Sequence, residues 1–334
     1  MNITVVYSEP TRRALASPYI DADEDTVESA REVVHALEKN GATVTLFGVS
    51  EDHIERIQGI RADCVFNLIE WTGQDLPLAD RAFAELEALH LPITGATRAN
   101  YMETTDKVAM KQALTRHGLP TARFQIFTRG DEKIRTDFRF PVIVKPALEH
   151  CSVGLTHDAV VENTDTLRER IQERIRTFEE PMIVEEFIKG LEFQVTVLET
   201  KTGLLVLPPA EILFTTKNQE NILTYDSRWD DETADYKSSH VSLATLDGIL
   251  LHALSSVTTQ TFRALGFRDY SRLDIRTRGS DIFILEANSN PGLSDDSEYG
   301  MTLSYRALGW NFSDFVWKIV ESAMHRVKKS DPRV

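Results

Sequence analysis

The first hundred residues alternate between strand-like and helix-like segments, and this alternation restricts the folds open to the chain. Short apolar runs predict strands at Ile3–Tyr7, Thr43–Val49 and Cys64–Ile69. Amphipathic periodicity predicts helices at Asp25–Lys39 and Leu78–Leu89. Strands joined through helices lie parallel in one sheet, so an α/β unit is expected here. No G-x-G-x-x-G follows the first strand, so an ordinary dinucleotide site is not expected.

The pattern changes at Thr104, after which strands outnumber helices. Further strands are predicted at Arg123–Phe127, Pro141–Lys145, Met182–Ile188, Glu192–Glu199, Leu204–Leu207, Glu211–Phe214, Tyr270–Thr277 and Asp281–Asn288. Further helices are predicted at Thr104–His117, Thr166–Phe178, Leu246–Leu265 and Phe312–Val327. The polar segment Thr215–Ser239 is long for a structureless loop, which favours a functional or mobile role. The chain is therefore predicted to combine α/β and α+β folds, and its 334 residues predict two or three domains.

The composition excludes several classes of protein. A net charge of −15 argues against a nucleic-acid partner, which needs a basic surface, but not against a nucleotide held by a few lysines. No apolar run approaches the ~18 residues of a membrane span, so no membrane partner is expected. Cys64 and Cys151 lie far apart in the sequence, and the N-terminus begins in a strand pattern without signal-peptide features. These features predict a cytoplasmic protein.

Several familiar catalytic motifs do not occur in the sequence. G-x-S-x-G, H-E-x-x-H and the phosphate loop G-x-x-x-x-G-K-[ST] are all missing, and the nine histidines show no zinc spacing. Any use of ATP would therefore require another scaffold.

The last two predicted strands carry the strongest chemical signal. A three-residue turn at 278–280 would place Arg272 opposite Glu286. Asp274 and Glu286 would then be diagonal neighbours about 7–8 Å apart, on the same face as Asn288. Carboxylates so placed can bridge hard cations, and paired metals in phosphoryl-transfer sites lie about 3.5–4 Å apart. A two-residue turn would put Asp274 and Glu286 on opposite faces. An Arg272–Glu286 ion pair beside a solvated Asp274 is an equally open interpretation.

Two other apolar strands end in polar groups. Lys145 follows three β-branched residues, and the polar segment 149–154 after it is a candidate flap whose N–H groups could cover phosphates. Glu185 and Glu186 end the next strand, where backbone groups and a carboxylate could contact an adenine and a ribose. Taken alone, a solvated lysine and a strand running out into solvent are the simpler interpretations.

Together, in this order, these segments resemble the ATP-grasp superfamily, specifically its D-alanine–D-alanine ligase-like branch. The resemblance begins with Thr94-Gly95 and Thr105-Asp106-Lys107 and is most specific at Leu285-Glu-Ala-Asn-Ser-Asn-Pro-Gly292. It implies an ATP-grasp fold with an N-terminal Rossmann-like (pre-ATP-grasp) domain. The implied domains are the N-terminal α/β domain at 1–100, a small central α+β subdomain at 101–190, and a C-terminal subdomain with metal and catalytic residues at 191–334.

Enzymes of this type use ATP to phosphorylate a carboxylate, and an amine then attacks the acyl phosphate to give an amide and ADP. The resemblance therefore implies a carboxylate–amine ligase that joins an amino acid to another amino acid, a peptide or a specialised-metabolite acid. It implies ATP and two Mg²⁺ ions as cofactors, with Mn²⁺ as an alternative. It also implies small carboxylic acid and amine substrates and a homodimer.

The resemblance assigns roles to individual positions. Those implied to contact the nucleotide are Lys107, Lys145, Cys151, Ser152, Glu185, Glu186, Phe187, Ile188 and Glu192. Those implied to bind the metal ions are Asp274, Glu286 and Asn288. Arg272 would stabilise the charge on the acyl phosphate, and Arg228, in a lid segment, would approach the γ-phosphate. Those implied to border the substrate are Gly292, Ser294 and Glu9.

The chain departs from the D-alanine ligase pattern on the substrate side. His150 and Cys151 replace a Gly-Ser pair in the flap, and Trp229 stands where those ligases carry a tyrosine. The segment Tyr7–Pro10 lacks the Gly-Gly-x-Ser sequence that precedes their substrate-binding glutamate, of which Glu9 would be a remnant. Amide formation is therefore expected and D-alanine specificity is not. The alternatives are D-alanine–D-alanine ligase itself and a nucleotide-binding protein without turnover.

Overall fold

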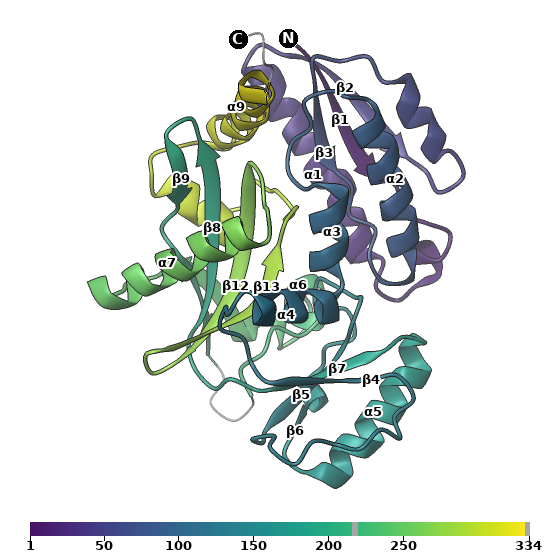
Figure 1. Ribbon diagram of the computed structural model, residues 1–334, viewed down its shortest axis with the longest axis vertical. Coiled ribbons are helices and arrows are strands. Elements are labelled where there is room, and N and C mark those ends of the chain that lie inside the picture. The colour runs from purple at the N-terminus through teal and green to yellow at the C-terminus, as the bar shows by residue number, and fades with distance from the viewer. Residues whose placement is uncertain (216–219, 331–334) are drawn as a thin grey trace.

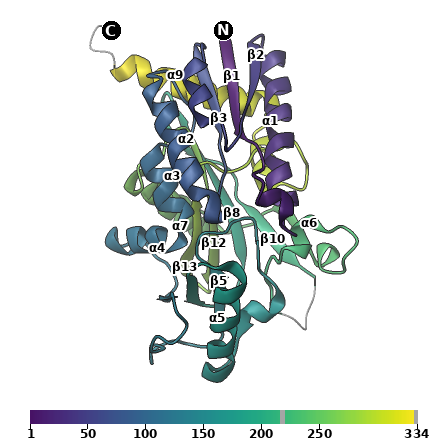
Figure 2. The ribbon, with the colours of Figure 1, turned by 90° about the vertical axis from the view of Figure 1, so that its right-hand side faces the viewer.

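The computed structural model describes residues 1–215 and 220–330, and its described strands form three sheets stacked along the long axis of the molecule (Figures 1 and 2). The N-terminal sheet is parallel, in the order β2-β1-β3. Its strands are β1 (Asn2–Ser8), β2 (Thr43–Val49) and β3 (Cys64–Leu68), and its main helices are α1 (Asp21–Lys39) and α2 (Leu76–Ala88). The predicted α/β unit is thereby confirmed.

The lowest sheet in Figure 1 is antiparallel and small, in the order β4-β7-β5-β6. It consists of β4 (Phe124–Phe127), β5 (Val142–Pro146), β6 (Val160–Val161) and β7 (Met182–Glu186). Helix α5 (Thr164–Phe178) covers one face, where its Leu167 and Ile171 join a buried cluster with Val144 and Val184. The other face is left to meet the central sheet.

The central sheet is antiparallel and has the order β11-β10-β8-β12-β13, with β9 also paired to β8. Its strands are β8 (Glu192–Thr200), β9 (Gly203–Val206), β10 (Ala210–Phe214), β11 (Ser239–Leu243), β12 (Tyr270–Arg278) and β13 (Asp281–Asn288). The helices that follow or flank it are α7 (Gly248–Ala264), α8 (Gly300–Arg306) and α9 (Phe312–Ser330). Because α9 packs against α1, the C-terminal end of the chain closes the core of the N-terminal unit.

The helix expected at Thr104–His117 is confirmed over most of its length, but its predicted start is wrong. The structure has two helices, α3 (Arg98–Thr105) and α4 (Lys107–Arg116), separated at Asp106. The backbone of Asp106 leaves the helical geometry. Its carboxylate accepts the N–H groups of Val108 at 2.8 Å and Ala109 at 3.2 Å, as an N-cap does. The break places Lys107 in the first turn of α4.

The three-residue turn expected between β12 and β13 is wrong. The expected placement of Asp274 and Glu286 on one face of the hairpin is nevertheless present. Arg278 pairs with Asp281, so the turn has two residues, not three. A register shift between Asp274 and Ile275 leaves Leu285 as an extra residue on β13. Past this bulge the pairing moves by one residue, so Asp274 lies directly opposite Glu286 instead of diagonally. The bulge thus restores the common face that a regular two-residue hairpin would have destroyed.

Parts of the segment Thr215–Ser239 are ordered into short elements. Helix α6 (Asp226–Trp229) and the 3₁₀ turn η5 (Tyr236–Ser238) lie within it, while residues 216–219 fall outside the described residues. None of the helices within residues 1–215 and 220–330 has both the length and the apolar character of a membrane span.

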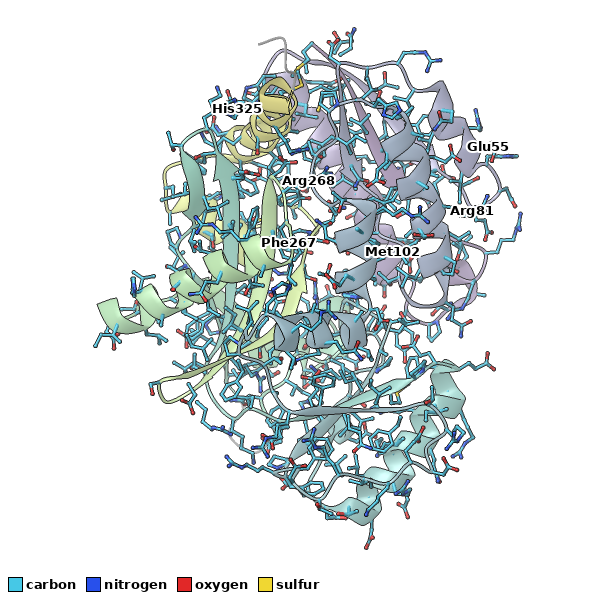
Figure 3. All side chains as sticks on the ribbon, in the orientation of Figure 1. Glu55, Arg81, Met102, Phe267, Arg268 and His325 are labelled. Atoms are coloured by element: carbon cyan, nitrogen blue, oxygen red, sulfur yellow. The ribbon has the colours of Figure 1, made fainter. Side chains whose placement is uncertain are left out.

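Buried polar contacts hold the N-terminal unit on the central sheet. Arg268, which Figure 3 places between them, donates to the carbonyls of Gly95 and Ala96, both at 2.9 Å. The neighbouring Asp269 is fully buried, accepts the Gly95 N–H at 2.8 Å and pairs with Arg326 at 2.5 Å. These contacts fix the edge of the parallel sheet relative to the β12–β13 hairpin.

Candidate active site

A cavity between the central sheet, the small sheet and the N-terminal unit collects most of the predicted site residues. It encloses about 1170 Å³ of empty space, including its open mouth. The predicted residues that line it are Lys145, Cys151, Ser152, Glu185, Glu186, Phe187, Ile188, Glu192, Arg228, Arg272, Asp274, Glu286, Asn288 and Gly292. These residues come from separate segments between residues 145 and 292, so only the fold brings them together.

The β12–β13 hairpin supplies the acidic wall of the cavity. Arg272 binds Asp274 through two hydrogen bonds, Nε to Oδ1 at 2.9 Å and Nη2 to Oδ2 at 3.1 Å. Asn288 Nδ2 donates to the same carboxylate at 3.2 Å. Glu286 pairs with Lys107 at 3.4 Å. The alternative Arg272–Glu286 ion pair is therefore not the arrangement that forms.

Glu286 is held ionised despite its burial. Burial alone would raise its pKa, but the positive charges around it, above all Lys107, outweigh that effect and hold the pKa well below its usual range. Lys145 and Arg272 act in the same direction. A carboxylate kept charged in this way is prepared to bind a cation at any physiological pH.

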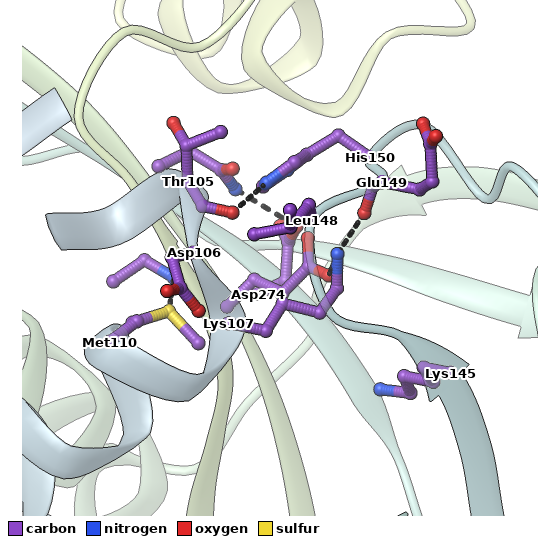
Figure 4. Close-up of polar contacts among 12 residues, drawn as sticks. Thr105, Asp106, Lys107, Met110, Lys145, Leu148, Glu149, His150 and Asp274 are labelled. Atoms are coloured by element: carbon purple, nitrogen blue, oxygen red, sulfur yellow. Dashed lines mark hydrogen bonds and ion pairs between the residues drawn. The ribbon is translucent and has the colours of Figure 1, made fainter. Parts of the chain in front are cut away.

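Lys107 also connects the hairpin to the flap. Its Nζ donates to the Glu149 carbonyl, and His150 Nε2 bonds the carbonyl of Thr105 at 2.8 Å (Figure 4). Burial, reinforced by the charge of Lys107, lowers the pKa of His150 to about 4, so this histidine is neutral at pH 7. In the flap, Cys151 and Ser152 adopt left-handed φ values of 53° and 62°, which are strained for residues with a side chain.

Lys145 shares a buried carboxylate with a second lysine that the sequence analysis missed. Lys111 is fully buried and its Nζ lies 2.7 Å from Glu185 Oε2, while Lys145 Nζ lies 3.7 Å from Glu185 Oε1. Glu185 Oε1 has no hydrogen-bond partner among the described residues. The signal was available, because Lys111 is one helical turn after Lys107 and faces the same side.

Glu192 is engaged by another residue that was missed. Arg276 Nε donates to Glu192 Oε2 at 2.7 Å, and its Nη1 donates to the Ile188 carbonyl at 3.0 Å. The guanidinium carbon also lies 4.8 Å from the centroid of the Phe187 ring. Arg276 therefore fixes the segment that links the small and central sheets.

The lid segment lies against the flap. Trp229 Nε1 donates to the Cys151 carbonyl at 3.1 Å, and the Tyr225 hydroxyl donates to Asp21 at 3.2 Å. Arg228 lines the cavity, and its guanidinium carbon lies 5.4 Å from the centroid of the Trp229 ring. The lid thus borders the cavity and directs a cation toward it.

Two predicted substrate residues lie away from the cavity. The Glu9 carboxylate packs against Gly48 of β2, and Ser294 Oγ accepts the N–H of Asp296 at 3.0 Å. The N-terminal unit contributes Asp25 and Glu70 to the lining instead. Burial, followed by the charge of Asp25, raises the pKa of Glu70 to about 7. Its position directly after a parallel strand was the available signal, since such strands meet ligands at their carboxyl ends.

Comparison with known proteins gives the family. The family model for the D-ala D-ala ligase C-terminus matches residues 113–321. Protein y4sG of Sinorhizobium fredii is 32% identical over 82% of this chain and 77% of its own. D-alanine–D-alanine ligase of Desulforudis audaxviator is 28% identical over 91% of this chain and 95% of its own.

Solved structures share the fold. D-alanine–D-alanine ligase from Bacillus anthracis, complexed with ATP, has a TM-score of 0.74 at 19% identity and covers 98% of this chain and 99% of its own. VanG D-Ala:D-Ser ligase from Enterococcus faecalis has a TM-score of 0.72 at 17% identity, covering 96% of this chain and 99% of its own. The predicted ATP-grasp fold is thereby confirmed. The chain belongs to the D-alanine–D-alanine ligase family of ATP-grasp ligases.

Proposed function

We propose that this protein is an ATP-dependent carboxylate–amine ligase that joins an amino acid to another amino acid, a peptide or a metabolite acid. The observation that carries the proposal is that Lys107 pairs with Glu286 and Arg272 pairs with Asp274. Both acids line one cavity together with Arg272 and Lys145. A carboxylate that attacks a triphosphate brings several negative charges together, and such cations stabilise them. The carboxylate attacks the γ-phosphorus, and the bond to the bridging oxygen of the β-phosphate breaks to release ADP. The amine then attacks the acyl carbon, the C–O bond to phosphate breaks, and the amine loses a proton to water.

The nucleotide is assigned to the side of the cavity nearest the small sheet. Lys107 and Lys145 would contact the phosphates, and the segment from Glu185 to Ile188 would border the adenine. Glu185 Oε1 supports this assignment: it is buried, accepts no hydrogen bond among the described residues and has Lys145 Nζ only at 3.7 Å, so the exocyclic amino group of adenine could donate to it. The ATP complex of the Bacillus anthracis relative supports the same choice of nucleotide.

The hairpin residues fit magnesium. Asp274 and Glu286 are cross-strand neighbours, and the amide of Asn288 donates its Nδ2–H to Asp274, which leaves its Oδ1 available to a cation. Within the described chain no cluster of three His, Cys, Asp or Glu residues can hold a metal alone, so phosphate oxygens and water would complete the coordination. Two Mg²⁺ ions, or Mn²⁺ in their place, would supply charge neutralisation there.

Arg272 and Arg228 are assigned to the reacting groups. Arg272 is oriented by Asp274 and buried, so it can stabilise developing charge without reorganising. Arg228 arrives from the lid, where its guanidinium lies over the Trp229 ring. Acyl phosphates hydrolyse readily, and the Trp229–Cys151 hydrogen bond that joins lid to flap would keep water out.

D-alanine specificity is not part of the proposal, although curated relatives carry the name D-alanine–D-alanine ligase. Two of the residues that depart from the D-alanine ligase pattern, Cys151 and Trp229, are joined by a hydrogen bond from Trp229 Nε1 to the Cys151 carbonyl. Glu9, the third, is turned away from the cavity. Because of the names of these relatives, D-alanine–D-alanine ligase is kept as the second candidate. The VanG relative, a D-Ala:D-Ser ligase, is an example of the same fold with a different acceptor.

The test is a matrix of amino acids and small carboxylic acids, scored by ADP and phosphate release with Mg²⁺ and ATP. Mass spectrometry then identifies the coupled product. We expect amide formation with at least one pair other than two D-alanines. Robust turnover with D-alanine alone would favour the second candidate. Nucleotide binding without ADP release across the whole matrix would identify a protein without turnover.

A further inference from the structure

A second cavity adjoins the first on the side of the N-terminal unit. It encloses about 1260 Å³ of empty space, including its mouth, and lies between the start of α1, the flap and the end of α5. Three residues, Glu70, His150 and Cys151, line both cavities. Glu70, His150 and Cys151 therefore form the boundary between the two cavities. Of the residues assigned to the nucleotide or the metal ions, Cys151 alone is among the described residues that line this cavity, so most of the space is open to a substrate.

The walls of the second cavity are acidic and aromatic. Asp23, Asp75 and Glu149 line it in addition to Glu70. Arg13 is the only Arg or Lys among the described lining residues; its side chain is 45% exposed and lies 4.0 Å from Glu149. One exposed arginine leaves the cavity with an excess of negative charge.

Asp23 is the carboxylate most affected by this excess. No hydrogen bond or ion pair to its carboxylate is found among the described residues. Burial, followed by repulsion from Asp75 and Glu149, raises its pKa to about 6. A positive group placed among these three carboxylates would relieve the repulsion.

The spread of the acids and the apolar lining favour an organic cation over a metal ion. No three His, Cys, Asp or Glu residues of the described chain lie close enough together to hold a metal. Tyr19 and Phe178 also line the cavity, with ring centroids 6.2 Å apart. Aromatic rings beside carboxylates suit an alkyl chain that ends in an ammonium group.

We propose that this cavity binds the cationic end of an amine substrate, so that one substrate is a diamine or a basic amino acid. Its reactive group reaches the catalytic cavity past Glu70 and Cys151, and its second ammonium group lies among Asp23, Asp75 and Glu149. The assignment of this molecule as a substrate rests on the proposed ligase function, whereas its binding does not.

Binding is tested first, without catalysis. Isothermal titration calorimetry with 1,5-diaminopentane, in the presence of Mg²⁺ and a non-hydrolysable ATP analogue, should show saturable binding, and n-pentylamine should bind at least tenfold more weakly. Asp23→Asn should weaken diamine binding at least tenfold. Glu24→Gln is the matched control: Glu24 is the next residue of α1, exposed and outside both cavities, and its loss should change nothing. Equal binding of both amines, or no effect of Asp23→Asn, would refute the proposal.

Catalysis is tested next with L-lysine and L-ornithine against L-norleucine, which has a similar chain without the second charge. We expect a preference of at least tenfold in kcat/KM for the basic amino acids, lost in Asp23→Asn and kept in Glu24→Gln. Asp23→Lys should reverse the preference toward L-glutamate. Amide formation without a preference for cations would overturn this inference and leave the ligase function intact. Diamine binding without ADP release would support the binding inference and overturn the ligase function.

Discussion

At the scale of single residues, the site is built from charges that burial would otherwise neutralise. Glu286 remains ionised because Lys107 and Lys145 face it, while Glu70 has the opposite environment and a pKa near neutrality. Carboxylates with such different environments suit different tasks. Glu286 is suited to binding a cation. Glu70 is suited to exchanging a proton with a ligand or to binding an ammonium group.

Glu286→Gln should abolish turnover and leave the protein folded. The change removes a charged ligand and leaves the shape of the side chain, so kcat should fall at least 10³-fold while the circular dichroism spectrum is retained. The control is Asp281→Asn at the exposed start of the same strand. Activity in Glu286→Gln equal to that of Asp281→Asn would remove the metal assignment.

Lys111→Met should destabilise the protein by about 3–5 kcal/mol, because it leaves the buried Glu185 carboxylate without its nearest partner. The free energy of unfolding in urea measures this. Lys189→Met, which breaks the exposed pair with Glu220, should cost less than about 1 kcal/mol. Adding Glu185→Gln to Lys111→Met should restore part of the loss. A loss unchanged in the double variant would show that packing, rather than charge, holds Lys111.

Glu180 should make stability depend on pH. It is buried, its Oε2 has no partner among the described residues, and burial raises its pKa to about 7. Between its ordinary pKa near 4.5 and about 7, the folded state binds more protons than the unfolded state, so stability falls as pH rises through this window.

The slope for one such proton is about 1.4 kcal/mol per pH unit. Urea unfolding at a series of pH values should show a shallower fall in Glu180→Gln than in the wild type. Glu179→Gln, at the exposed neighbouring position, should keep the wild-type slope. The same slope in all three proteins would contradict the assignment.

At the scale of elements, two local irregularities place the site residues. The break at Asp106 starts a new helix at Lys107, and the bulge at Leu285 brings Glu286 to the same face as Asp274. The break places Lys107 where it pairs with Glu286, and the bulge places Glu286 on the wall of the cavity.

Asp106→Ala should therefore affect nucleotide binding as well as stability. Loss of the cap costs about 1 kcal/mol, and a frayed first turn would displace Lys107 and raise the KM for ATP severalfold. Asp247→Ala is the control, because it removes the equivalent cap of α7. The Asp247 carboxylate accepts the Leu250 N–H at 2.8 Å. That variant should lose similar stability in urea and keep the KM. An equal KM in both variants would show that the break does not position Lys107.

At the scale of the whole molecule, the catalytic cavity exists only because three sheets meet. The N-terminal unit contributes Asp25 and Glu70, and the buried contacts of Asp269 hold that unit in place. Cytoplasmic location and homodimerisation stay predictions. For the second, light scattering should give twice the mass of one chain at micromolar concentration, and a monomer there would contradict it.

The sequence by itself determined the strands, the fold class and the residues at the ends of apolar strands. Lys145, Glu185 and Glu286 were predictable only together, because each polar group alone fits a solvated strand end or a simple ion pair as well as a binding site. The order of these patterns also identified the ATP-grasp fold.

Only the tertiary structure decided which charges meet. Arg272 pairs with Asp274 rather than Glu286 because a bulge shifts the register, and a bulge depends on neighbouring strands rather than on the turn alone. Glu9 is turned away and Glu70 is turned in because their directions are set by packing between distant segments. Electrostatic interactions depend on distance in space, and sequence patterns report only distance along the chain.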